Sequence, residues 1–324
     1  MNTEKYIKNI FNINNQDDFN RCALELFHYQ FKLNKIYNQY VNLIGTNPKH
    51  VHSYEEIPFL PIELFKTKNI LSGKHKIQRT FFSSGTTSSY KSRHNIIDLL
   101  LYQRSIKESF ELFFGNPKQY VFICLVPNSE ESSLSYMCYT LINLSENKKS
   151  GFYLKKPNEI IRTVNDCKRE NKKFILFGLS FAILEFAQNY KSDLTGGIII
   201  ETGGMKNKKH IVREDLYKDL TSTFMIKKIY SEYSMTELLS QSYLLNGYFQ
   251  SPPWKKVVIR NKNNPLVIVN DHSLRGCINI IDLANLHSCG FISTNDIGKF
   301  VDGGFDIIGR AQNSSERGCN LMLE

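Results

Sequence analysis

Three short apolar runs in the middle of the chain constrain its fold more than any other feature. They are bounded by turn residues and read QYVFICLVP (119–127), KKFILFGLS (172–180) and GGIIIETGG (196–204). Runs that are apolar on both faces are typical of buried strands in parallel or mixed sheets. Stretches with helical periodicity lie between them, which favours β–α–β units. The pattern therefore predicts an α/β fold in which helices flank mixed or parallel sheets.

The two ends of the chain carry different patterns. Residues 17–45 repeat apolar side chains at intervals of three and four and stop at Gly45, which predicts one long helix or two short ones. The last third is rich in strand patterns, at residues 254–260, 265–270 and 276–284. No internal repeat or low-complexity linker interrupts the chain, so one compact body is the simplest interpretation. Within it, we expect a helical segment of residues 1–52 to pack on a main body of residues 53–324.

Composition and charge narrow the class of protein. The chain has 324 residues, of which 41% are hydrophobic, and this is ample for a packed core. The net charge is +10, and many lysines stand in short polar runs that are most simply solvated surface. The alternative is attraction of acidic ligands or partners, such as nucleotides or an acidic carrier protein. No nucleic-acid motif accompanies the charge, so we expect no nucleic-acid partner.

The spacing of the cysteines and the length of the apolar stretches indicate the cellular compartment. None of the seven cysteines forms a Cys-x-x-Cys pair, which argues against a structural zinc site. The first twenty residues are polar and lack the apolar core of a signal peptide. The longest apolar stretches, such as residues 120–126, are too short to span a bilayer. We therefore expect a cytoplasmic protein with free thiols and no membrane span.

A hydroxyl-rich loop follows the apolar pair Phe81–Phe82. The segment FFSSGTTSSY (81–90) contains Ser83, Ser84, Gly85, Thr86 and Thr87, and a helical pattern at residues 95–114 comes after it. Hydroxyls, backbone N–H groups and a permissive glycine suit a polyphosphate, although such turns are common by themselves. The loop is not a Walker motif, because the Gly-Lys-Ser/Thr ending is absent. His94 lies close enough to a phosphate to matter, but a solvated basic turn is its simpler interpretation.

Three further elements follow the loop in order. A glycine pair, Gly203 and Gly204, ends the third apolar run. The segment IYSEYSMTELLS (229–240) contains a Tyr-Ser-Met-Thr-Glu element made of Tyr233, Thr236 and Glu237. The segment STNDIGKFVDGGFDIIGR (293–310) gives Asp296 and, at the end of a predicted strand, Arg310. Taken singly, these residues read as a core aromatic, a carboxylate at a helix start, a turn former and a surface cation.

Taken together and in this order, the four elements resemble the signatures of the adenylate-forming superfamily of acyl- and aryl-acid synthetases, adenylation domains and luciferases. Within it, the LuxE-type acyl-protein synthetases are most similar, on the segments IPFLPIELFK (57–66), SSLSYM (132–137) and SSERGCNLML (314–323). The resemblance runs from about residue 50 to the end of the chain. The phenylacetate–CoA ligase branch is the nearest competitor.

The resemblance implies a fold and a reaction. The fold would be the N-terminal domain of adenylate-forming enzymes. The reaction would use ATP and Mg²⁺ to convert a carboxylic acid, fatty or other, to an acyl-adenylate with release of pyrophosphate. The acyl group would then pass to a protein thiol and on to a reductase or carrier protein. The sequence stops fourteen residues after Arg310, so we expect it to lack most of the mobile lid that carries the family's catalytic lysine. Lysines elsewhere, or a partner subunit, would have to supply that cation.

The resemblance also implies roles for the phosphate-binding residues. Ser83, Ser84, Thr86 and Thr87, with the amides around Gly85, would hold the β- and γ-phosphates. Thr236 would hydrogen-bond the α-phosphate, and Glu237 would hold the Mg²⁺ ion that bridges the phosphates.

The nucleoside and acid sites follow in the same way. Tyr233 would lie flat on the adenine, with Gly203 and Gly204 letting the backbone approach the base. Asp296 would accept hydrogen bonds from the ribose hydroxyls, and Arg310 would add positive charge nearby. The acid pocket would come from residues 177–182 and 201–206, which look apolar and small enough for an acyl or aryl chain.

Cys319 is the candidate acyl acceptor. A thiolate is a strong nucleophile toward an acyl-phosphate anhydride, and the nearby Arg317 would favour it. A buried structural cysteine is the simpler alternative, and the other six cysteines fit that interpretation. Two other functions stay open: a ligase that transfers the acyl group directly to coenzyme A or a carrier protein, and a non-catalytic nucleotide-binding or scaffold protein.

Overall fold

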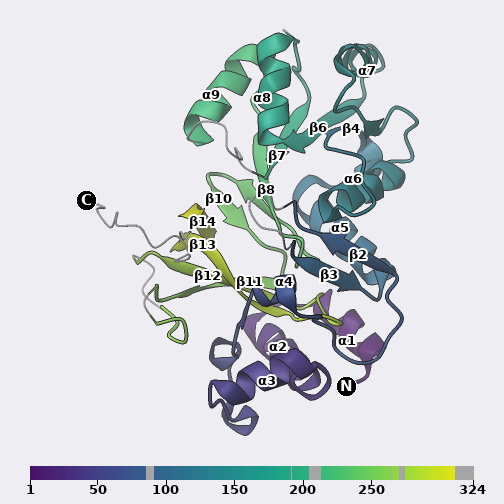
Figure 1. Cartoon of the computed structure of the whole chain (residues 1–324). Helices are drawn as coiled ribbons and strands as arrows, with labels where there is room; N and C mark the ends of the chain where they lie inside the picture. Colours follow the sequence, from purple (N-terminus) through teal and green to yellow (C-terminus); the bar gives the residue numbers. More distant parts are fainter. Residues whose placement is uncertain (85–90, 191, 204–212, 263, 270–273, 311–324) are drawn as a thin grey trace.

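The computed structural model describes the chain except for residues 85–90, 191, 204–212, 263, 270–273 and 311–324 (Figure 1). Within the described residues, twelve strands form one sheet in the order β11-β12-β13-β14-β10-β9-β8-β7-β6-β4-β5, with β1 (Leu60–Pro61) paired to β13. A separate hairpin pairs β2 (Arg79–Phe82) with β3 (Arg93–Ile96).

One half of the large sheet is parallel. It contains β4 (Tyr120–Leu125), β5 (Gly151–Phe152), β6 (Lys173–Leu179), β7 (Ile198–Thr202) and β8 (Ile229–Tyr233). The three apolar runs expected to be buried strands are β4, β6 and β7, which confirms that prediction. Their side chains alternate between two cores, because successive residues of a strand point to opposite faces.

Helices cover both faces of the parallel half (Figure 1). On one face, α5 (Leu99–Phe114) and α6 (Ser133–Leu144) pack on Phe122, Phe177 and Ile200. On the other, α7 (Pro157–Arg169), α8 (Ser180–Asn189) and α9 (Arg213–Phe224) pack on Ile123, Leu176 and Ile199. The predicted helix at residues 95–114 begins only at Leu99, where the Asp98 side chain caps α5. Residues 95–96 instead pair in β3.

The other half of the sheet is antiparallel. It contains β9 (Ser242–Leu245), β10 (Tyr248–Gln250), β11 (Lys255–Arg260), β12 (Gly276–Asp282), β13 (Phe291–Val301) and β14 (Gly304–Arg310). The runs at 254–260 and 276–284 are confirmed as β11 and β12. The prediction of a strand at 265–270 is wrong, since its described residues make only one bridge, Arg260 to Ile268. A turn at Asn264, whose carbonyl accepts from the Val267 amide, bends this run away from a regular ladder.

The N-terminal helices lie against the antiparallel half (Figure 1). They are α1 (Thr3–Ile10), α2 (Gln16–Leu33) and α3 (Lys35–Leu43). The segment 17–45 therefore forms two helices, because Asn34 ends α2 and its side chain caps α3. Buried side chains of α1 and α2 share one core with β12 and β13. A boundary at residue 52 stays a prediction.

Short elements join these layers. The described connections contain three 3₁₀ turns, η1 (Pro48–His50), η2 (Tyr54–Glu56) and η3 (Pro117–Gln119), and the single-turn helix α4 (Leu64–Thr67). The described residues hold no helix that is both long and apolar enough to cross a membrane.

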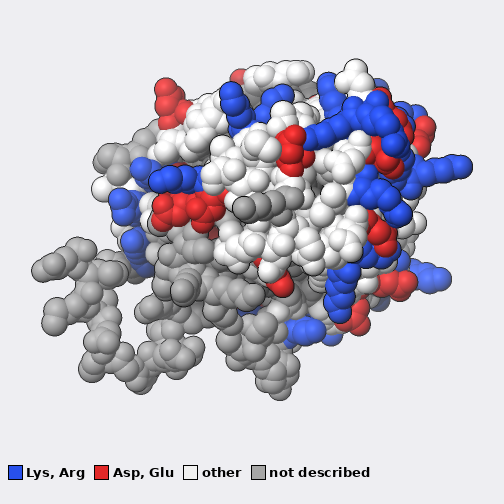
Figure 2. All heavy atoms as spheres, turned by 90° about the horizontal axis from the view of Figure 1, so that it is seen from above, with Lys and Arg blue, Asp and Glu red and all other residues white. Residues whose placement is uncertain are grey.

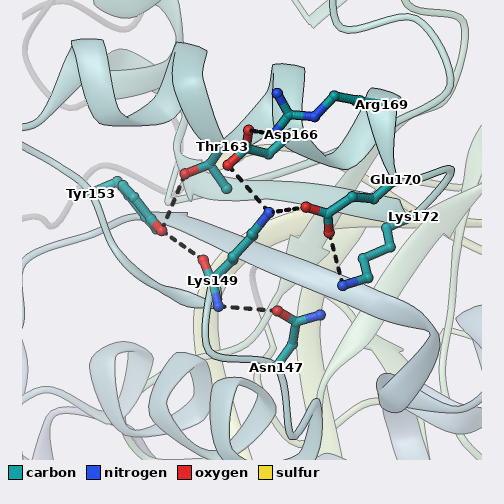
Figure 3. Close-up of polar contacts among 8 residues, drawn as sticks. All are labelled: Asn147, Lys149, Tyr153, Thr163, Asp166, Arg169, Glu170 and Lys172. Carbon is teal, nitrogen blue, oxygen red and sulfur yellow. Dashed lines mark hydrogen bonds and ion pairs between the residues drawn. The ribbon is translucent and has the colours of Figure 1, made fainter.

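Some charged side chains on the surface form pairs of opposite sign. Seen from above, Lys and Arg are most numerous on the right of the view, with Asp and Glu among them (Figure 2). Lys149 joins Asp166 and Glu170 at the end of α7, and Lys172 also contacts Glu170 (Figure 3). Exposed pairs of this kind contribute little to stability. They fit the interpretation of the lysine runs as solvated surface.

Candidate active site

The predicted site residues gather where the parallel strands end and the antiparallel half begins. Tyr233 is the last residue of β8, and Gly203 follows β7 directly. The hairpin of β13 and β14 supplies Asp296 and Arg310, which are register partners. Ligands of open α/β sheets bind at the carboxyl ends of strands, so this is the expected place for a site.

Asp296 lies between two predicted nucleoside-binding residues. The Tyr233 hydroxyl donates to Asp296 Oδ2 across 2.8 Å, and Arg310 Nε donates to Oδ1 across 2.9 Å. Burial, and then the negative charge of Asp296, raise the pKa of Tyr233 well above its usual value. The same charge raises the pKa of Arg310. Three residues separated by 63 and 14 positions along the chain thus meet at one carboxylate.

The Tyr233 ring is supported from within the sheet. Its centroid lies 5.8 Å from that of Phe249 and 5.9 Å from that of Phe305. Lys255 Nζ lies 5.4 Å from the ring centroid. Stacking of this ring on adenine stays a prediction, and these contacts would hold the ring in place for it.

Gly203 forms the turn after β7. Its φ of +79° lies in the left-handed region, where a side chain is strained, and an added Cβ would lie 3.0 Å from Leu179 Cδ2. Gly204 lies outside the described residues. The strand therefore ends in a turn that favours glycine, as the sequence pattern indicated.

His94 fastens the β2–β3 hairpin to the Thr-Glu element. Its Nδ1 lies 2.8 Å from the carbonyl oxygen of Thr236, and because a carbonyl only accepts, Nδ1 carries the proton. The ring is buried and packs edge-on against Phe65. Burial lowers the pKa of His94 to about 4, so the imidazole is neutral near pH 7. The interpretation of His94 as a solvated basic turn is wrong, because β3 directs the ring into the core.

Glu237 is a buried carboxylate whose surroundings are partly basic. Burial raises its pKa, while the Ser92 hydroxyl, Arg310 and Lys66 act in the opposite direction. The Asn285 side-chain amide donates to the Glu237 carbonyl across 2.8 Å. The carboxyl group is therefore held beside a hydroxyl donor and within reach of two cations.

The donor set at Glu237 fits a Mg²⁺ ion that takes its other ligands from phosphates and water. Mg²⁺ is usually held by one or two carboxylates together with substrate phosphates. Within the described ranges, no group of three His, Cys, Asp or Glu side chains is placed to hold a metal without a substrate. One buried carboxylate thus matches the metal role predicted for Glu237.

The structure describes the residues on either side of residues 85–90 of the hydroxyl-rich loop. The Ser83 amide donates to the Ser92 carbonyl across 3.0 Å, and the Ser92 amide donates to Ser83 Oγ across 2.9 Å. Ser84 is exposed at the start of the loop. Gly85, Thr86 and Thr87 lie outside the described residues, as does Cys319. Their predicted roles stay predictions.

Comparison of the sequence with family models identifies the family of this chain. The model of LuxE, acyl-protein synthetase, matches residues 9–324. This chain belongs to the LuxE family. The comparison with curated proteins gives no match.

Solved structures agree on the fold of this LuxE-family chain. A 2-hydroxyisobutyryl-CoA ligase in complex with its adenylate and CoA has a TM-score of 0.68 at 11% identity, covering 91% of this chain and 70% of that one. The luciferase-like enzyme of the mealworm Zophobas morio gives 0.52 at 16% identity, covering 83% and 65%. An ATP-bound RpMatB-BxBclM chimera gives 0.57 at 13%, covering 74% and 48%. The chain thus spans between about half and seven tenths of these three proteins. The prediction of the adenylate-forming N-terminal-domain fold is confirmed.

Sequence reasoning missed two charged residues of the candidate site. Lys255 is buried, and its Nζ donates to the carbonyls of Tyr233 and Ser240. Burial lowers the pKa of Lys255 to about 8. Asp282 accepts from the amides of Leu239 and Ser240. Strand alternation could have flagged Lys255, because its side chain shares a parity with the buried residues Val257 and Ile259.

The segments expected to form an apolar acid pocket contain buried polar groups instead. Glu201 is buried and accepts from the hydroxyls of Ser180 and Ser231. The Thr202 carbonyl, 3.0 Å from Ser180 Oγ, is a second acceptor for the single proton of that hydroxyl. The prediction that residues 177–182 and 201–206 are apolar is therefore wrong at Ser180, Glu201 and Thr202. The two acids of neighbouring strands, Glu201 and Glu232, are buried because hydroxyl groups satisfy their oxygens in part or in full.

Proposed function

We propose that the chain activates a carboxylic acid with ATP, forming an acyl-adenylate and pyrophosphate. The observation that carries the proposal is the placement of Asp296 between Tyr233 and Arg310, on the side of the site where Glu237 is buried. Family membership and the fold of the ligase relatives support it.

The nucleoside would bind at the Asp296 cluster. Its carboxylate is nearly buried, whereas the side chain of Arg310 is 78% exposed and can move to admit a ligand. A ribose diol would take the place of the Tyr233 hydroxyl or the Arg310 guanidinium on the carboxylate oxygens. The Tyr233 ring, braced by Phe249 and Phe305, would then offer a rigid face to adenine.

The phosphates would lie toward Thr236, Glu237 and the hydroxyl-rich loop. When bound, Mg²⁺ supplies charge neutralisation that lets one anion approach another. Glu237 would hold that ion, Thr236 would hydrogen-bond the α-phosphate, and Ser83 and Ser84 would meet the terminal phosphates. Lys66 and Arg310, the cations near Glu237, would add positive charge.

The first chemical step is a displacement at the α-phosphorus. A carboxylate oxygen of the acid forms a bond to the α-phosphorus as the bond to the β-phosphate oxygen breaks, and pyrophosphate leaves with that electron pair. Positioning and electrostatic stabilisation supply most of the rate enhancement for such transfers. The residues around Asp296 and Thr236 provide both.

The second step would transfer the acyl group to sulfur. A thiolate at Cys319 would attack the acyl carbon, the bond to the phosphate oxygen would break, and AMP would leave, while the thiol proton passes to solvent. An acyl-accepting protein, a reductase or a carrier, would then receive the fatty or other acyl group. A reducing cytoplasm would keep the thiol available.

Intact-mass analysis tests the proposal. The wild type, Glu237→Gln, Cys319→Ser and the control Cys167→Ala, a buried cysteine of α7, are incubated with ATP, Mg²⁺ and a panel of acids. We expect AMP formation and a hydroxylamine-labile mass gain in the wild type and control only. A gain that persists in Cys319→Ser would move the acceptor elsewhere. AMP that forms only when coenzyme A or a carrier protein is added would favour the direct ligase, and nucleotide binding without AMP would favour the non-catalytic alternative.

A further inference from the structure

Glu232 is a buried acid, and one of its carboxylate oxygens has no hydrogen-bond partner among the described residues. It precedes Tyr233 in β8 and is 5% exposed. Its Oε2 accepts from the Thr202 hydroxyl across 2.6 Å. Its Oε1 has no hydrogen-bond partner in the part of the chain that the structure describes. Burial raises the pKa of Glu232, while the side chains of Ser234 and Thr202 and the charge of Lys255 act in the opposite direction.

A second polar atom without a partner lies on the neighbouring strand. Tyr243 of β9 is the register partner of Glu232, so the two side chains stand opposite each other on the same face of the sheet. Tyr243 is fully buried, and its hydroxyl also lacks a partner among the described residues. Buried polar groups in folded proteins are normally hydrogen-bonded, so two such atoms on a facing pair require an explanation.

The walls around the pair come from the helices of that face. The electrostatic influence of Glu232 reaches Tyr102 of α5 and Cys138 of α6, so the carboxyl group looks toward both helices. The Tyr243 ring packs edge-on against Phe113 and Phe114 of α5. The pair thus faces aromatic and thiol side chains, and the buried Lys255 ammonium also acts on Glu232.

The other buried acid of this region shows that the arrangement is specific. Glu201 stands on β7 and points to the opposite face, and each of its oxygens accepts from a serine hydroxyl, Ser180 or Ser231. Both oxygens of Glu201 thus have a hydroxyl partner. In Glu232, Oε2 has the Thr202 hydroxyl, and Oε1 has no hydrogen-bond partner among the described residues.

The position of the pair connects it to the site of acid activation. Glu232 adjoins Tyr233 and lies four residues before Thr236, and its partner Thr202 adjoins Gly203. The unpartnered atoms therefore lie at the end of β8 nearest the candidate site. An acid that reacts near Thr236 would have to place a polar group in this region, where Glu232 is 5% exposed and Tyr243 is fully buried.

We propose that the substrate is a hydroxylated carboxylic acid whose hydroxyl group binds between Glu232 Oε1 and the Tyr243 hydroxyl. This inference rests on the proposed function, because it assumes that an acid is activated at Thr236. A hydroxyl matches the pair because it donates to the carboxylate oxygen and accepts from the phenol. An ammonium group offers donors only, and an alkyl chain satisfies neither atom.

Selectivity between matched acids tests the inference. Acid-dependent ATP–pyrophosphate exchange is measured for pairs of acids that share a carbon skeleton and differ by one hydroxyl. The proteins are the wild type, Tyr243→Phe, Glu232→Gln and the control Glu201→Gln, each checked by thermal unfolding. Tyr243→Phe removes one oxygen and keeps the ring, so it is the variant most certain to fold.

We expect the wild type to favour the hydroxylated member of at least one pair by about tenfold or more in kcat/KM. Tyr243→Phe should reduce that preference by about tenfold while changing kcat/KM for the plain acid by less than about threefold. Glu201→Gln should leave the preference unchanged. Equal or better use of the plain acid in every pair, or a preference that survives in both Tyr243→Phe and Glu232→Gln, overturns the inference.

Two further readouts separate this inference from the proposed function. If no acid supports exchange, the proposed function fails. Calorimetric titration of the same acid pairs into the wild type and Tyr243→Phe then tests, independently of catalysis, whether a hydroxyl group binds at Glu232 and Tyr243. Tighter binding of the hydroxylated acid that Tyr243→Phe abolishes would support the pocket. A crystal structure in which one water bridges Glu232 and Tyr243 both with and without bound acid would overturn it.

Discussion

The His94 imidazole donates a hydrogen bond to the carbonyl of Thr236, a residue 142 positions later in the chain, across 2.8 Å. Asn285 holds the next carbonyl, that of Glu237. Two buried side chains from different elements thus fix consecutive peptide groups of the proposed phosphate and Mg²⁺ site. The link also joins this site to β3, the strand that follows the hydroxyl-rich loop.

Replacing His94 should change the rate of acid activation more than the stability of the fold. His94→Leu removes the donor, and we expect a loss of kcat between about tenfold and a hundredfold, since small misplacements of reacting groups are costly. His94→Asn can still donate to the Thr236 carbonyl and should recover most of that loss. Pyrophosphate release at saturating substrates measures the effect. The exposed His28→Asn is the control, and an unimpaired His94→Leu would contradict the role.

His94 should also make stability depend on pH. Burial lowers its pKa from 6.5 to about 4, so between these values the unfolded chain binds more protons than the folded one. Stability from the neutral imidazole is complete above pH 6.5 and declines as the pH falls toward 4, by roughly 3 kcal/mol at most. Urea unfolding at pH 7, 5.5 and 4.5 should show a steeper decline for the wild type than for His94→Asn. Parallel declines would exclude His94 as the cause.

Asp296 should control the affinity for ATP. Asp296→Asn keeps the shape but removes the charge that Arg310 and a ribose diol require, so we expect KM for ATP to rise by about tenfold to a hundredfold. KM for the acid should change much less. The matched control is Asp302→Asn, an exposed residue of the same hairpin, for which we expect no change. An unchanged KM in Asp296→Asn would remove Asp296 from the nucleotide site.

Gln30 should stabilise the loop that carries Asn285. Its amide donates to the carbonyls of Asn285 and Leu286 and accepts from the Gly290 amide, all in the core. Gln30→Met leaves these backbone groups without partners and should lower the free energy of unfolding by about 2–4 kcal/mol. Lys32→Ala, exposed on the same helix, should change it by less than about 0.5 kcal/mol. Denaturant titration of both variants gives the comparison, and equal effects would contradict the role of Gln30.

Local patterns were enough to predict much of the fold. The apolar runs that became β4, β6 and β7 identify themselves by composition and length, because a strand buried on both faces needs apolar side chains at every position. The pattern at residues 265–270 failed for a related reason. An apolar run forms a strand only where a partner strand continues beside it, and here the ladder ends after one bridge.

The sequence by itself determined the order of the signature elements, the three apolar strands β4, β6 and β7, and the position of Arg310 at the end of a strand. These features depend on neighbours close in the chain, where periodicity and turn residues act. Only the tertiary structure decided that His94 is buried against Thr236, that Lys255 and Asp282 hold the segment around Glu237, and that Glu232 faces Tyr243. Each of these depends on which distant strands pair and which face of a strand meets a helix. A side chain's protonation and hydrogen bonding follow from that burial, and burial is a property of the packed chain.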